Sequence, residues 1–204
     1  MPDPARLLLI RHGEVSNPNH LVYGDLPGFH LSPLGVLQAH AVGRHLSGTR
    51  IDGVITSPLA RAIETATAVA RHHGLAPVVE SRLTESGQLP HWTGNRWEEL
   101  TSLYPGELEH YLVDASAVDT AESLASVADR YVVVAEEAVT PGGGTIAIVG
   151  HQDPVQAARL RLTGRALSDL RTDPPSHAEV ITLMRTATRI WTEVSRWAPS
   201  VSTG

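Results

Sequence analysis

Two short stretches of this chain are apolar without interruption, and they predict the centre of the fold. One covers 7–10, and the other lies within 145–149. A strand that is buried on both faces needs apolar residues at every position, as in the middle of a parallel sheet. Shorter apolar stretches predict four further strands at 51–55, 77–79, 178–184 and 190–195, the last two as a hairpin at the sheet edge.

Between these stretches, apolar residues recur at helical spacing. They predict helices over 33–46, 58–70 and 120–140, and one from Asp153-Pro154 to about 162. Ser32-Pro33 and Ser57-Pro58 each pair an N-cap residue with a proline at the first helical position. We therefore predict an α/β fold, a three-layer α/β/α sandwich around a mostly parallel sheet, as a single domain over residues 1–204.

Two segments break this alternation. Residues 15–31 are rich in Asn, Pro and Gly and predict a long loop over the carboxyl edge of the sheet, where loops are commonly functional. In 81–118 the periodicity weakens, and Trp, Tyr and His cluster among Gly, Pro and Glu. We interpret 81–118 as an inserted lid with one or two short helices.

Composition narrows the classes of function. The 204 residues carry a net charge of −6, which argues against nucleic-acid or acidic-membrane partners. There is no cysteine, and all 16 Lys and Arg residues are Arg, so thiol, Schiff-base and P-loop lysine chemistry are excluded. The chain shows neither a membrane-span pattern nor a signal pattern, and we expect a cytoplasmic protein.

Charged and imidazole side chains follow the predicted strands directly. His12 ends the first apolar run beside Arg11, and His151 ends the second. In an open α/β sheet, ligands bind beyond the carboxyl ends of the strands, so we expect these residues to meet there. Arg61 falls in the first turn of a helix, where the dipole opposes a cation, and an anion between them would explain the placement. Glu85 follows the third strand.

In order and spacing, these pieces resemble the histidine phosphatase superfamily, which has the phosphoglycerate mutase-like fold. The matching segments are Leu9-Ile10-Arg11-His12-Gly13-Glu14, Leu31-Ser32-Pro33-Leu34-Gly35, the run from Thr56 to Ala66, Leu83-Thr84-Glu85 with Trp92-Thr93-Gly94, and Val149-Gly150-His151. They span residues 7 to 151, and jointly they are specific.

The resemblance implies a phosphohistidine mechanism. His12 would attack phosphorus as a neutral imidazole, while Arg11 and Arg61 grip the phosphoryl oxygens. The same resemblance implies that His151 donates a hydrogen bond to an oxygen and that Glu85 protonates the leaving alcohol and then activates water. Asn17 is a candidate for a further amide donor to the phosphate. We expect no cofactor and no metal, since no side-chain set shows metal-ligand spacing.

Hydrolysis of a small phosphorylated metabolite is the leading hypothesis for the function. Phosphoglycerate mutase-type transfer is the nearest alternative, although the lysines and the Glu-Arg-His-Tyr-Gly pattern of those mutases are missing. A non-catalytic phospho-ligand binding protein and a phosphoprotein phosphatase are further alternatives. Gln152 departs from the glycine that is common after the second histidine. Candidates for substrate contact are Tyr23, His30, Gln88, His91 and Trp92. We expect Trp92 and Trp97 to pack within the lid, and the alternative is that one of them lines the substrate pocket. Trp and Tyr residues of 81–118 are also a candidate homodimer contact.

Overall fold

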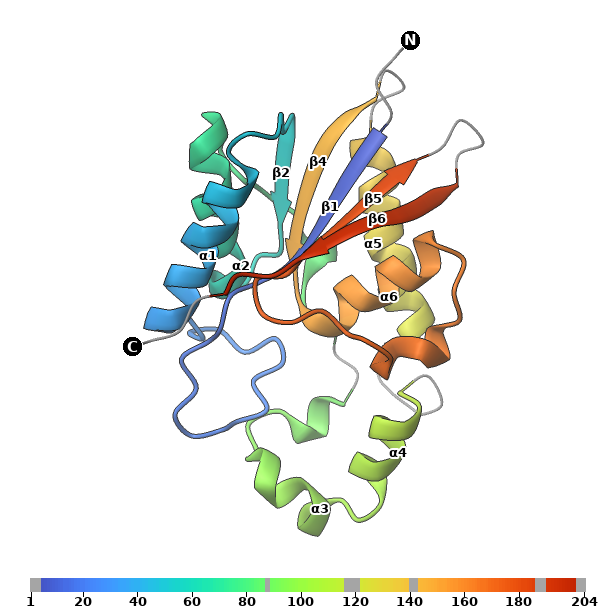
Figure 1. Ribbon diagram of the computed structural model, residues 1–204. Coiled ribbons are helices and arrows are strands. Elements are labelled where there is room, and N and C mark those ends of the chain that lie inside the picture. The colour runs from blue at the N-terminus through green and yellow to red at the C-terminus, as the bar shows by residue number, and fades with distance from the viewer. Residues whose placement is uncertain (1–4, 87–88, 116–121, 140–142, 186–189, 201–204) are drawn as a thin grey trace.

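The fold is built on one mixed sheet. The computed structural model describes residues 5–86, 89–115, 122–139, 143–185 and 190–200, and its sheet has six strands in the order β3-β2-β4-β1-β5-β6 (Figure 1). The strands are β1 (Ala5–Arg11), β2 (Gly53–Thr56), β3 (Val78–Val79), β4 (Gly144–Gly150), β5 (Val180–Arg185) and β6 (Trp191–Trp197). Strands β3, β2, β4 and β1 are parallel, while β5 and β6 form the expected antiparallel edge hairpin.

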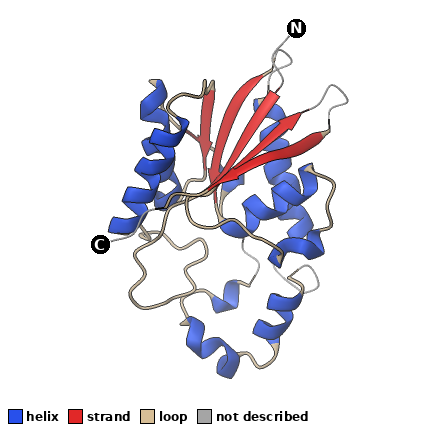
Figure 2. Cartoon of the chain, viewed as in Figure 1, coloured by secondary structure: helices blue, strands red, loops and turns tan. Residues whose placement is uncertain are grey.

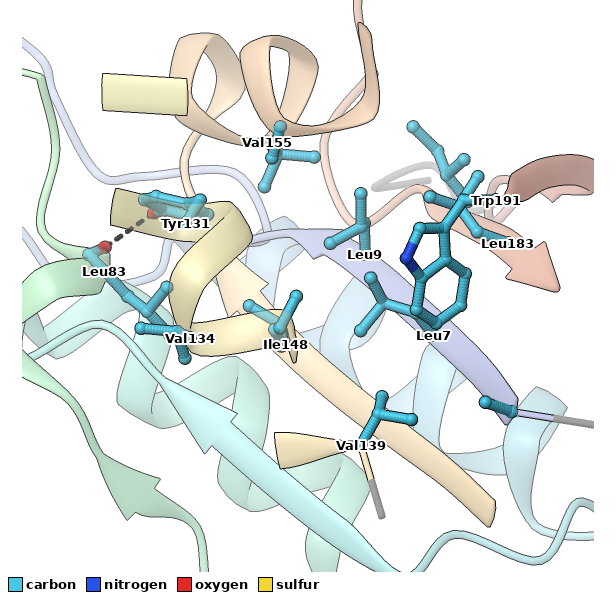
Figure 3. Packing of buried hydrophobic residues seen from close by; sticks show 14 residues of the cluster. Leu7, Leu9, Leu83, Tyr131, Val134, Val139, Ile148, Val155, Leu183 and Trp191 are labelled. Atoms are coloured by element: carbon cyan, nitrogen blue, oxygen red, sulfur yellow. Dashed lines mark hydrogen bonds between the residues drawn. The ribbon is translucent and has the colours of Figure 1, made fainter. Parts of the chain in front are cut away.

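Helices cover both faces of the sheet, which confirms the three-layer prediction (Figure 2). Leu8 and Ile10 of β1 pack against helices α1 (Pro33–Leu46) and α2 (Ala60–Ala70). Leu7 and Leu9 point to the other face, toward α5 (Leu124–Ala138) and α6 (Gln152–Leu162) (Figure 3). Side chains alternate along a strand, so an uninterrupted apolar run is what a central strand with two covered faces requires.

The pairing of β1 with β4 determines which residues leave the sheet together at its carboxyl edge. Its four consecutive apolar side chains are at most 2 % exposed, and each contributes about 1.5–3 kcal/mol of burial free energy. The parallel register sets Arg11 opposite Gly150 of β4, so the next residues, His12 and His151, leave the sheet side by side. The His12 amide donates to the Gly150 carbonyl at 2.9 Å and prolongs this pairing past the strand end.

The backbone just after His12 packs tightly against the start of α1. A Cβ on Gly13 would lie 2.6 Å from the Gly35 carbonyl oxygen, which is closer than real contacts allow. Ser32 caps α1 as predicted, since its Oγ accepts from the Gly35 amide at 3.0 Å and donates to Glu14 at 2.7 Å. These contacts fix the position of His12.

The segment between β3 and α5, which we call the inserted segment, begins in the core at Leu83 and then extends beyond the carboxyl ends of the strands, where α3 and α4 lie away from the sheet (Figure 1). It contains three 3-10 turns, η2 (Ser81–Leu83), η3 (Pro90–Trp92) and η4 (Trp97–Glu99), and the short helices α3 (Leu100–Leu103) and α4 (Glu107–Val113). The segment has its own apolar cluster around Trp92 and Leu100. Two further 3-10 turns, η1 (Arg71–His73) and η5 (Leu167–Arg171), follow α2 and α6.

Two of the predicted helix caps are wrong. Helix α2 begins at Ala60, and its N-cap residue is Leu59, without a side-chain hydrogen bond. Helix α6 begins at Gln152, before the predicted cap Asp153. In both cases the polar side chain bonds elsewhere: Ser57 contacts His151, and Asp153 pairs with Arg171. The predicted helix 120–140 starts at Leu124, after the capping Ser123.

Among the described residues, no helix combines the length and the apolar character that a membrane crossing needs.

Candidate active site

The two histidines at the strand ends form the centre of the site. The rings of His12 and His151 lie 5.2 Å apart, centre to centre, at an interplanar angle of 63°. Both residues are at most 1 % exposed, although an imidazole is polar. The structure thus brings together the two residues that end the two apolar strands.

His12 is held as a neutral imidazole with one free nitrogen. Its Nδ1 lies 2.7 Å from the Gly13 carbonyl oxygen, and since a carbonyl only accepts, Nδ1 carries the hydrogen. The lone pair is therefore on Nε2. Burial, and next the charges of Arg61 and Arg11, hold the pKa of His12 well below its usual range. The geometry and the charges together keep Nε2 unprotonated at neutral pH, which is the state that nucleophilic attack requires.

His151 is oriented by a residue that the sequence did not single out for the site. Its Nε2 lies 2.7 Å from the Ser57 hydroxyl, and its Nδ1 is buried without a hydrogen-bond partner. Nδ1 faces the Glu85 carboxylate at 3.7 Å. If Ser57 donates to Nε2, Nδ1 carries the hydrogen and is free to donate to an oxyanion. From the sequence, Ser57-Pro58 was assigned only to helix capping, so the contact of Ser57 with His151 was not predicted.

Glu85 lies next to this pair as a carboxyl group that stays partly protonated at neutral pH. Burial, and next the charge of Asp153, raise the pKa of Glu85 to about 7. Its Oε1 accepts from the Ser86 amide at 2.9 Å. Arg130 of α5 fixes the backbone here by donating to the carbonyls of Thr84 and Glu85 at 2.9 and 3.2 Å. Such a pKa suits a group that first gives and then takes a proton.

The raised pKa of Glu85 has a consequence for stability. Below its usual pKa of 4.5 the Glu85 carboxyl is protonated in both the folded and the unfolded chain. Between pH 4.5 and about 7 the unfolded chain ionises this group while the folded chain keeps it protonated, so the free energy of unfolding falls as the pH rises. Glu85→Gln should therefore gain about 1–3 kcal/mol over the wild type between pH 4 and pH 8 in urea unfolding. An unchanged difference between the two proteins over that range would contradict the raised pKa.

Arg11 is held by three acceptors. Its Nη1 donates to Gln152 Oε1 at 2.5 Å and to the Pro175 carbonyl at 2.9 Å, and its Nη2 lies 2.8 Å from His177 Nε2. Because a guanidinium only donates, His177 Nε2 accepts. Burial, and next Arg11, lower the pKa of His177 to about 4, so it stays neutral.

Sequence reasoning missed His177, whose ring centre lies 5.9 Å from that of His12. It precedes an antiparallel strand instead of following a parallel one. Strand β5 begins where its neighbour β1 ends, so the residues just before β5 reach the same sheet edge. The predicted edge hairpin could have indicated this position.

Arg61 is a buried cation, and no carboxylate among the described residues is hydrogen-bonded to it. Its side chain is 0 % exposed, its Nη2 donates to the Gly24 carbonyl at 2.6 Å, and its Nε and Nη1 have no partner in that part of the chain. The Tyr23 ring lies 4.8 Å from the guanidinium carbon. Buried charges are normally paired, so two unused N–H groups beside the histidines indicate a place for an anion.

Asn17 is hydrogen-bonded within the loop after β1. Its side-chain amide donates to the Leu21 carbonyl at 2.9 Å and accepts from the Leu21 amide at 3.0 Å. These bonds are those of a turn-forming residue, the alternative that Asn before Pro also allows, and the role of Asn17 as a phosphate donor stays a prediction.

A cavity of about 470 Å³ opens at the candidate site. Arg11, His12 and Glu85 line it, and so do Tyr23, Trp92 and Trp97. The other candidates for substrate contact lie elsewhere: His30 pairs with Glu64 and His91 with Glu107, both largely exposed, and Gln88 lies outside the described residues.

The family follows from sequence comparison. A model of the histidine phosphatase superfamily (branch 1) matches residues 7–197, and the chain belongs to this superfamily. It is an enzyme of the histidine phosphatase class. The match covers nearly the whole fold, including the strand ends that hold His12 and His151.

Several curated relatives share most of the chain. A protein of unassigned function from Mycobacterium tuberculosis is 36% identical over 82% of this chain and 83% of its own length. Phosphoserine phosphatase 1 of Hydrogenobacter thermophilus is 32% identical over 80% and 79%, and a 2,3-bisphosphoglycerate-dependent phosphoglycerate mutase of Thermoplasma acidophilum is 30% identical over 74% and 72%. A solved structure of mycobacterial glucosyl-3-phosphoglycerate phosphatase with VO3 superposes with a TM-score of 0.84, at 25% identity, and covers 96% of this chain and 100% of its own.

Proposed function

We propose that this chain is a phosphomonoesterase that acts on a small phosphorylated metabolite through a phosphohistidine on His12, without a metal. The observation that carries the proposal is a buried, neutral His12 under the charges of Arg61 and Arg11, whose buried guanidinium N–H groups include three nitrogens without a partner among the described residues. Nucleophile and anion site are thus supplied by the same few residues.

The first half-reaction transfers the phosphoryl group to the enzyme. His12 Nε2 attacks phosphorus, and the bond from phosphorus to the ester oxygen breaks. The proton of Glu85 goes to that departing oxygen and gives the free alcohol. Arg11, Arg61 and the Nδ1–H of His151 stabilise the charge on the three other phosphoryl oxygens.

The second half-reaction restores the enzyme. Glu85, now ionised, takes a proton from water, and the water oxygen attacks phosphorus. The bond from phosphorus to Nε2 breaks, its electron pair returns to His12, and inorganic phosphate leaves. A pKa near 7 lets Glu85 serve both steps at neutral pH.

The two alternatives make different predictions for phosphoglycerate. A mutase would convert 3-phosphoglycerate to 2-phosphoglycerate with bisphosphoglycerate present and release little phosphate, and the mutase relative keeps this alternative open. A binding protein would retain phosphate without hydrolysing any ester. The raised pKa of Glu85 favours an enzyme over a binding protein, since a ligand site alone needs no proton donor.

Phosphate release from a panel of metabolite phosphoesters, measured with EDTA present, tests the proposal. We expect EDTA to leave the rate unchanged, because the phosphoryl charge is neutralised by Arg and His side chains. Among the described residues, no group of three or more His, Asp or Glu side chains is arranged to hold a metal. Loss of activity in EDTA that Mg²⁺ or Zn²⁺ restores would contradict the proposed site.

Glu85→Gln should separate substrates by their leaving group. An alkoxide needs a proton as it departs, whereas p-nitrophenolate does not. We expect turnover of an alkyl phosphate to fall by about 10²–10³-fold and that of p-nitrophenyl phosphate to fall much less. Glu98→Gln, at an exposed carboxylate, is the matched control and should change neither. Equal losses for both esters would assign the acid to another residue.

A cytoplasmic location and a homodimer stay predictions. Exposed Trp97 in the inserted segment remains the candidate for a subunit contact. Trp97 also lines the cavity.

A further inference from the structure

The outer wall of the cavity differs in character from the catalytic end. It is formed by the loop after β1 and by the inserted segment, and it is apolar or aromatic at most positions. These residues are Val22, Leu89, Trp92, Trp97 and Leu112. The ester oxygen would leave from the catalytic end, so the alcohol part of a substrate extends along this wall.

Two of the polar groups on this wall already have partners. Trp92 donates from its indole Nε1 to Glu107 at 3.1 Å, and the Tyr111 hydroxyl donates to Asp153. Both side chains therefore present rings to a ligand and not donors. Trp97 and Leu112 line the cavity and are still 44% and 55% exposed, which leaves apolar surface for a bound group to cover.

Arg171, a cation that lines this wall, is paired with a carboxylate. Arg171 donates from Nη1 and Nη2 to the two oxygens of Asp153, each at 2.9 Å, and its guanidinium lies 4.3 Å above the Tyr111 ring. Asp25 is exposed and adds a negative charge to the lining of the cavity. Among the described cavity-lining residues, the cation without a carboxylate hydrogen-bonded to it is Arg11, which belongs to the catalytic end.

We infer that the substrate is a phosphomonoester whose alcohol part is uncharged and carries an extended apolar or aromatic group. This inference rests on the proposed function. A second anionic group on the substrate would meet no free cation among the described residues of the outer wall and would face Asp25. Trp97 and Leu112 are then specificity-determining residues that cover the apolar group.

Three esters with the same kind of leaving group test the inference: butyl phosphate, 4-phenylbutyl phosphate and 4-phosphooxybutanoate. All three release a primary alkoxide, so differences in kcat/KM report the wall and not the chemistry. We expect phenylbutyl phosphate to exceed butyl phosphate by about tenfold or more, as burial of a phenyl group allows. We expect the carboxylate ester to fall below butyl phosphate by about tenfold.

Variants locate the effect. Trp97→Ala should reduce the ratio of kcat/KM for phenylbutyl over butyl phosphate by about threefold or more, and Trp97→Phe should restore most of it. Leu103→Ala is the control, because Leu103 lies on α3, is 51% exposed against 44% for Trp97, and does not line the cavity. That variant should leave the ratio unchanged.

The outcomes separate this inference from the proposed function. Hydrolysis of all three esters with equal kcat/KM, or a preference for the carboxylate ester, would overturn the inference and leave a phosphatase. If Trp97→Ala leaves the ratio of kcat/KM for phenylbutyl over butyl phosphate unchanged, Trp97 is not a specificity-determining residue. If none of the esters is hydrolysed, and no other phosphomonoester is either, the proposed function fails.

Discussion

Replacing His12 by glutamine is expected to abolish phosphatase turnover, with kcat reduced by about 10⁴-fold or more. Glutamine has a similar size and can still contact the Gly13 carbonyl, but it offers no nucleophilic nitrogen. The loss should therefore appear without unfolding. Phosphate release from any ester that the wild type hydrolyses measures kcat, and circular dichroism reports the fold.

His20→Gln is the matched control for His12→Gln. His20 is an exposed histidine on the loop after β1, where it pairs with Glu98 at 2.9 Å, and its removal should leave turnover unchanged. Residual His12→Gln activity within tenfold of the wild type would assign the nucleophile to another residue.

Arg61→Met is expected to lower kcat/KM by about 10³-fold while leaving the protein at least as stable as the wild type. The guanidinium is fully buried, and two of its nitrogens have no partner, so its charge costs folding free energy that a phosphoryl group would compensate. Methionine fills a similar volume without that cost. We expect the free energy of unfolding to rise by about 1 kcal/mol or more, measured in urea.

Arg159→Met gives the opposite case in the same protein. Arg159 is 4% exposed and pairs with Glu193 through two hydrogen bonds of 2.6 and 3.1 Å. Removing it leaves a carboxylate without its partner, so this variant should lose stability. A loss of stability in Arg61→Met of the same size would show that Arg61 supports the fold and not an anion.

The parts of the fold that could be predicted are those with a strong local signal. The run 7–10 predicted a strand covered on both faces, and the structure confirms it with side chains that are at most 2% exposed. Ser32-Pro33 predicted the start of α1. The same device failed at Ser57-Pro58, because the hydroxyl of Ser57 bonds a histidine 94 residues further along the chain. A local pattern cannot contain that contact.

In the candidate site, the residues at strand ends could be predicted, and those that depend on the paths of loops could not. The residues at parallel strand ends, His12 and His151, could be placed together from the sheet alone. His177 required the antiparallel pairing of β5 with β1, and the partners of Asp153 required the loop after α6 to return to the inserted segment. Asn17 was assigned from the resemblance, but its amide bonds to its own loop. Contacts that depend on loop paths are beyond periodicity and spacing.

The central claim is that phosphate passes through His12, and rapid-quench labelling tests it most directly. Enzyme mixed with a ³²P-labelled ester, quenched in base within milliseconds and digested, should carry an acid-labile, base-stable label on the peptide that contains His12. His151→Ala should slow turnover yet keep some of that label. Label on His151, or label retained by His12→Gln, would contradict the account.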